Sequence, residues 1–103
     1  MTAKQGEDDI KVIRIGPGLI ALNAVGAAAS VYDLLRMAYN SARVTGNPED
    51  LRQVKELINT VESWRDSPNE EERRAYKIFM RNYKKLYKEA KDWLRREKQQ
   101  AMQ

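Results

Sequence analysis

The sequence predicts a nearly all-α protein: a three-helix bundle, or a helical hairpin plus a long helix, with a short N-terminal extended arm or strand. Three observations predict this fold. Apolar residues recur at helical spacing over residues 18–45, 48–65 and 68–98. The connections between these segments are short, which favours antiparallel neighbours. The chain has 103 residues, so we expect one helical domain over residues 1–103, with residues 1–16 as the arm.

The arm contains a β-branched segment. Residues 10–15, Ile-Lys-Val-Ile-Arg-Ile, have the composition of a short strand. No second strand-like segment follows in the sequence, so a strand here would leave its backbone groups unpaired. We therefore expect this segment to pair with another subunit, to lie against its own helices, or to stay extended.

The first helix is expected to start at Gly16-Pro17-Gly18, which is a turn signal, and to end near residue 45, before Gly46. Its first half is unusually rich in small residues. A glycine inside a helix costs about 1 kcal/mol relative to alanine, so Gly26 indicates a closely packed neighbour. That neighbour could be a helix of the same chain or a helix of a second subunit.

The second and third helices carry clear start signals. Asn47 is a capping residue and Pro48 suits a first helical position, which predicts the helix over residues 48–65. Ser67 and Glu70 have the spacing of a capping box, and they predict the third helix over residues 68–98.

Self-association is expected from three parts of the chain: the arm, the small-residue face of the first helix, and the distal end of the third helix. The third helix is longer than the second, so its distal end should overhang the bundle and expose an apolar contact surface. The candidate self-association residues are Ile10, Val12, Ile13, Ile15, Ala24, Gly26, Ala28, Trp93 and Leu94.

The third helix carries a series of seven basic residues at alternating steps of four and three. These steps return to the same face of a helix, so the residues form one stripe, about 32 Å long. Residues 73–98 contain eleven Lys/Arg and three Asp/Glu, although the whole chain has a net charge of only +4. This basic stripe, flanked by Lys85, consists of Lys77, Arg81, Lys84, Lys88, Lys91, Arg95 and Lys98.

A ridge of like charge suggests a partner with repeating negative charge, and nucleic acid is the first candidate. The aromatic residues of the third helix lie on its opposite, apolar side, so we expect contacts to the phosphate backbone rather than to bases. Three other interpretations stay open: an acidic protein surface, an anionic lipid surface, and a solvated face. A solvated face would be supported by the intrahelical pairs Lys85–Glu89 and Lys88–Asp92.

The composition excludes most catalytic chemistry. The chain has no cysteine and no histidine, which removes thiolate nucleophiles, most zinc sites and the usual proton shuttle near neutral pH. The acidic runs Glu7-Asp8-Asp9 and Glu70-Glu71-Glu72 are interpreted as solvated charge, because neither lies in a metal-binding loop pattern. We therefore expect no enzymatic activity, no cofactor, no metal site and no small-molecule substrate.

The functional hypothesis is a non-enzymatic, self-associating structural protein that coats or organises DNA or RNA through phosphate contacts. A nucleoid-like protein or a subunit of a viral nucleoprotein or capsid would fit. The alternative is a structural or adaptor subunit of a protein-only filament or shell. The N-terminal segment is acidic, unlike a cationic leader, and the apolar stretch over residues 19–32 is too short to span a bilayer. We therefore expect a cytoplasmic, nucleoid or virion location, and we do not expect the chain to span a membrane.

Overall fold

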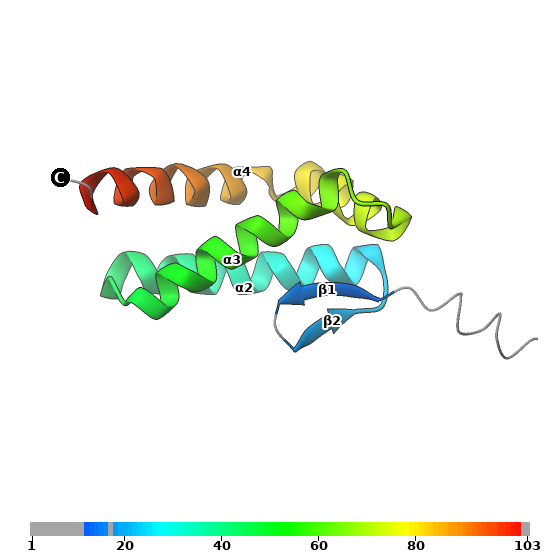
Figure 1. Cartoon of the computed structure of the whole chain (residues 1–103), viewed down its shortest axis with the longest axis horizontal. Helices are drawn as coiled ribbons and strands as arrows, with labels where there is room; N and C mark the ends of the chain where they lie inside the picture. Colours follow the sequence, from blue (N-terminus) through cyan, green and yellow to red (C-terminus); the bar gives the residue numbers. More distant parts are fainter. Residues whose placement is uncertain (1–11, 17, 102–103) are drawn as a thin grey trace, which may run out of the picture.

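The computed structural model describes residues 12–16 and 18–101, with side chains described as far as Lys98. In chain order the elements are strand β1 (Ile13–Gly16), strand β2 (Leu19–Ala21), helix α2 (Ala24–Thr45), helix α3 (Pro48–Arg65) and helix α4 (Glu70–Ala101). Figure 1 shows the three helices packed together, with the two strands beside the N-terminal end of α2. This arrangement confirms the predicted helical bundle with a short N-terminal strand.

The arm does not contain a lone strand. β1 and β2 form an antiparallel hairpin in which Ile13 lies opposite Ala21. The expectation that no second strand follows β1 was therefore wrong, and so was a first helix beginning at residue 18, because α2 begins at Ala24. Gly18 has a φ of 77°, in the left-handed region that glycine adopts without a steric penalty. Here it precedes a strand instead of starting a helix.

Both ends of α2 are capped. The side chain of Asn23 accepts a hydrogen bond from the backbone N–H of Gly26 at 2.7 Å, which satisfies one of the free donors of the first turn. At the other end, Gly46 has a φ of 68°, and its N–H donates to the carbonyl of Ala42 at 2.9 Å. This is the left-handed glycine end expected from the sequence.

The bounds of α3 agree with the predicted residues 48–65. Asn47 accepts a hydrogen bond from the N–H of Glu49 at 2.8 Å, and Pro48 occupies the first turn, where its missing N–H leaves no bond unmade. The local signals alone therefore determine where this helix starts.

The start of α4 differs from the expected capping box of Ser67 and Glu70. The cap is Asn69, whose side chain accepts hydrogen bonds from the N–H groups of Glu71 and Glu72 at 2.8 and 3.3 Å. Ser67 instead accepts from the N–H of Asn69 at 3.0 Å and so stabilises the turn before the helix. The helix consequently begins two residues later than predicted, at Glu70.

Helix α4 is kinked at Tyr83, which has a non-helical φ of −129° and ψ of 19°. The kink involves neither proline nor glycine, the residues that most often bend a helix. It coincides with stacking of the Tyr83 ring on Tyr32 of α2, with ring centroids 4.2 Å apart. Figure 1 shows the break between the two halves of α4. The basic stripe therefore follows two helical segments: Lys77 and Arg81 precede the kink, and the other five residues follow it.

The core lies between the three helices and β1. Its largest fully buried side chains include Trp64 of α3, Phe79 of α4 and Leu35 of α2. Ile13 and Ile15 of β1 are also buried, at 0% and 4% exposure. Burying these apolar side chains is the main stabilising term, and it fixes β1 against its own bundle.

Candidate nucleic-acid interface

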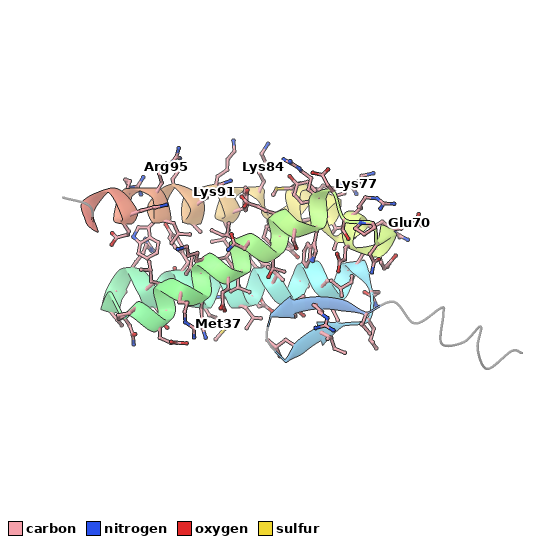
Figure 2. The ribbon with its side chains drawn as sticks, in the orientation of Figure 1. Met37, Glu70, Lys77, Lys84, Lys91 and Arg95 are labelled. Carbon is pink, nitrogen blue, oxygen red and sulfur yellow. The ribbon has the colours of Figure 1, made fainter. Side chains whose placement is uncertain are left out.

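All seven residues of the basic stripe are exposed to solvent, as is the flanking Lys85. Figure 2 shows Lys77, Lys84 and Arg95 projecting from the outer side of α4, away from α2 and α3. All the predicted binding residues are therefore accessible in spite of the kink, and Lys91 differs from the others in reaching toward Glu62 of α3.

Two residues of the stripe are paired with carboxylates. Lys91 forms an ion pair with Glu62 of α3, and Arg95 pairs with Asp92 one turn before it on α4. Within the described part of the chain, no ion pair involves the remaining stripe residues or Lys85. These six cations are Lys77, Arg81, Lys84, Lys85, Lys88 and Lys98.

The intrahelical pairs expected for a solvated face, Lys85–Glu89 and Lys88–Asp92, are not formed between these described residues. Asp92 is taken by Arg95. Like charges one helical turn apart destabilise a helix by about 0.2–0.5 kcal/mol per pair. An anionic partner would remove part of that cost.

Glu62 is the centre of a small polar cluster between α3 and α4. The hydroxyl of Tyr87 donates to its carboxylate at 2.6 Å, and the ammonium of Lys91 donates to the same oxygen. Partial burial would raise the pKa of Glu62, but the hydrogen bonds from Lys91 and Tyr87 outweigh it and hold the pKa below its ordinary value. The hydrogen bond to Glu62 in turn raises the pKa of Lys91.

The aromatic residues of α4 pack inward. Phe79 is buried and makes edge contacts with Tyr83 and Tyr87. Trp93 contacts the ring of Tyr39 on α2 edge-on, with centroids 5.7 Å apart. These rings stabilise the bundle, so the accessible side of α4 offers cations without a stacking surface for bases.

The expected overhang of the third helix was wrong. The contact between Trp93 and Tyr39 places the second half of α4 beside α2, and Leu94 is half-buried against the core. The kink at Tyr83 allows both halves of the long helix to stay in contact with the bundle. The predicted lengths of the second and third helices do not reveal this kink.

Most of the candidate self-association residues serve the chain's own core. Four of them are buried at 5% exposure or less: Ile13, Ile15, Ala24 and Ala28. They are consequently not available to a second subunit in this fold. This outcome corresponds to the alternative in which the arm lies against its own helices.

The self-association candidates Val12 and Gly26 are not part of the buried core. Val12 is 36% exposed, and Ile10 lies outside the described residues. Gly26 is half-buried, and a Cβ added there would meet, among the described side chains, the Asn23 cap of its own helix, the nearest atom at 3.3 Å. Among the described residues, no atom of a second helix lies within 4 Å of that Cβ position, so these residues do not supply the inferred close neighbour.

Sequence reasoning missed an exposed apolar patch at the hairpin and the start of α2. Its four residues were assigned to the interior of a long helix. They are instead exposed by 47 to 72%, and this apolar patch consists of Leu19, Ile20, Leu22 and Val25. The signal in the sequence was their density: four large apolar side chains within seven positions, directly after a glycine turn.

A groove of about 980 Å³ between α3 and the second half of α4 was also missed. Several stripe residues line it, and so does Lys55 of α3, which the sequence analysis did not consider. A groove between helices depends on their separation, which neither helical pattern encodes by itself.

Within residues 12–16 and 18–101, none of the helices has the length and apolar character needed to cross a membrane. In the same residues, no group of three or more Asp or Glu side chains is arranged to hold a metal ion. Comparisons with protein families, with curated proteins and with solved structures found no match.

Proposed function

We propose that this chain is a non-enzymatic, self-associating protein that binds nucleic acid through the phosphate backbone, along the basic stripe of α4. The observation that carries the proposal is the set of six exposed cations without a carboxylate partner among the described residues. Duplex DNA presents one negative charge per about 1.7 Å of its axis, so a row of cations along α4 can face several phosphates at once.

The proposed contacts carry little sequence information. Lysine and arginine side chains that neutralise phosphates release counterions, which makes the affinity depend steeply on salt. Phe79, Tyr83 and Trp93 of α4 pack against other rings of the bundle and would not stack on bases. The protein would therefore coat or organise DNA or RNA, as a nucleoid-like protein or a subunit of a viral nucleoprotein or capsid does.

Self-association is proposed to use the apolar patch. In Figure 1 the hairpin lies on the side of the bundle away from α4. Copies joined there would keep their basic stripes free and far apart, which limits the repulsion between them. The same patch favours the alternative function, a subunit of a protein-only assembly that makes no contact with nucleic acid.

A charge-reversal experiment tests the proposal. Lys77, Arg81 and Lys84 are changed together to Glu, because all three are exposed and none pairs with a described carboxylate. Binding to a generic duplex DNA and a generic duplex RNA is measured by fluorescence anisotropy over a range of salt concentrations. The wild type should bind at least one polymer, and the variant should lose about three units from the slope of log K against log salt.

The matched control changes three exposed cations outside α4 to Glu: Arg14, Arg36 and Lys55. It alters the net charge by the same amount and should reduce the affinity much less. Equal losses in the two variants would show that only the total charge matters, and failure of the wild type to bind either polymer would contradict the proposal.

The oligomer is tested separately by sedimentation. Replacing Leu22 and Val25 by Asp should lower the mass in solution without changing the salt slope of nucleic-acid binding. If the wild type assembles through the apolar patch but binds neither polymer, the protein-only alternative is supported instead.

A further inference from the structure

The groove between α3 and α4 is lined by two matching series of residues. On α3 the series is Leu51, Lys55, Ile58 and Glu62, and on α4 it is Tyr87, Lys91, Leu94 and Lys98. Each series follows steps of four, three and four, which keeps its members on one face of its helix. In each, two large apolar residues lie seven positions apart with a lysine between them.

Residues at this spacing form a continuous strip along one side of a helix, where a second helix can pack. Each series covers three helical turns, about 16 Å at about 1.5 Å per residue. Ile58 is buried at 3% exposure, whereas Leu51, Leu94 and Tyr87 remain half-buried. The groove therefore has an apolar floor open to solvent, with the length and shape that an amphipathic helix occupies when it binds between two others.

The charges around the groove indicate what charge a helix bound in it should carry. Three carboxylates line the groove: Glu62 and Asp92 are paired with Lys91 and Arg95, and Glu97 forms no ion pair with a described residue. The five Lys and Arg residues of the lining outnumber these three carboxylates. Lys55 borders one side, and Lys88 and Lys98 border the other; none of these three forms an ion pair with a described residue. An occupant with carboxylates beside its apolar face would complement this rim, and a basic occupant would be repelled.

We propose that the groove binds an amphipathic α-helix of about three turns from a partner protein, with apolar residues at steps of three and four and Asp or Glu along both flanks. This interaction goes beyond nucleic-acid binding and does not rest on it, because the apolar floor and Lys55 lie off the basic stripe. A phosphate backbone has no apolar face to cover Leu51 and Leu94.

The test uses a synthetic peptide of about 14 residues, with Leu at alternating steps of three and four and Glu at the flanking positions. Its binding to the full-length protein is measured by fluorescence anisotropy. The Lys55→Glu variant should bind it about three- to tenfold more weakly than the wild type, since one rim attraction becomes a repulsion. Lys98→Glu should have a similar effect on the opposite side.

The matched control is Lys77→Glu, which makes the same charge change on α4 before the kink, outside the groove. It should leave the affinity for the peptide within about twofold of the wild type. Leu94→Glu, which changes the floor, should abolish binding. If that variant fails to fold by circular dichroism, the two exposed rim variants decide the result.

Backbone amide chemical shifts locate the bound peptide. The largest changes should fall within residues 51–62 and 87–98. Changes centred on the apolar patch would overturn the proposal. So would equally tight binding of a peptide carrying Lys in place of Glu, or no binding at millimolar concentration. If Lys55→Glu lowers the mass of the protein in solution without peptide, the occupant is a second copy and the proposal is likewise overturned.

Discussion

The carboxylate of Glu62 on α3 accepts a hydrogen bond from the hydroxyl of Tyr87 on α4, 25 positions later, at 2.6 Å. Lys91 donates to the same carboxylate oxygen from the next turn of α4. This contact joins the second half of α4 to α3, and it also occupies one cation of the basic stripe. Stability and the charge available for binding are therefore linked at Glu62.

Replacing Tyr87 by Phe should lower the free energy of unfolding by about 1 kcal/mol. The change removes the hydroxyl that bonds Glu62 and keeps the ring that contacts Phe79. Urea denaturation of the two proteins measures the difference. Tyr83→Phe is a suitable control, since Tyr83 is also a half-buried tyrosine of α4 and its hydroxyl forms no hydrogen bond with a described residue. An equal loss in the control would show that the bond to Glu62 has no special role.

The contribution of Glu62 should depend on pH. Its pKa in the folded protein lies below the ordinary value of 4.5, so its charged form stabilises the fold above that value. The stabilisation should be lost as the pH falls through the lower, folded-state pKa. The wild type should therefore exceed Glu62→Gln in unfolding free energy at about pH 7, and the gap should narrow as the pH falls below the ordinary value of 4.5. A gap that is unchanged over this range would exclude an ionic origin.

Glu62→Gln should also strengthen binding to nucleic acid by about two- to fivefold at low salt, because it releases Lys91 from its ion pair. The variant would thus be less stable but bind more tightly, a combination that general damage to the fold does not produce. Anisotropy titrations with duplex DNA measure the change. Glu49→Gln removes the same charge from α3, where Glu49 pairs with Arg52 of the same helix, and serves as control; it should have a smaller effect.

Glu71 connects the starts of two helices. Its carboxylate accepts a hydrogen bond from the backbone N–H of Ala24, at 3.0 Å, and so caps α2 from the first turn of α4. The interpretation of Glu70-Glu71-Glu72 as purely solvated charge was therefore wrong for Glu71. Glu71→Ala should cost about 1 kcal/mol of stability in chemical denaturation. Glu70→Ala, at an exposed neighbour, should cost clearly less.

Gly46→Ala should destabilise the protein by about 1 kcal/mol. The backbone there has a φ of 68°, which residues other than glycine rarely adopt, although no described atom beyond its chain neighbours lies within 4 Å of the added Cβ. The cost therefore comes from the local backbone conformation and not from a clash with the rest of the protein. Thermal unfolding measures it, and an unchanged melting temperature would show that the end of α2 can relax.

The start of α3 could be predicted because Asn47 and Pro48 act within one turn of the chain. The hairpin was missed because Leu19–Ala21 is short and apolar, and only its pairing with β1 makes it a strand. The capping role of Asn69 was missed because, in the sequence alone, Ser67 fits the capping pattern equally well. Local hydrogen bonds were thus predictable where a single candidate existed.

The properties of the candidate site likewise fall into those that the sequence predicts and those that it does not. The exposure of the basic stripe followed from helical spacing, since a periodic row of charges cannot be buried without partners. Which of its cations are neutralised did not follow, because Glu62 lies on another helix.

By itself, the sequence determined three helices, the N-terminal cap of α3 and a single exposed row of cations, because these properties depend on contacts within a few turns. Tertiary packing decided the rest: the pairing of β1 with β2, the kink at Tyr83, the burial of Ile13 and Ile15, and the groove beside Leu94. Each of these depends on which surfaces meet across long stretches of chain, and the energy of such contacts exists only once the helices have come together.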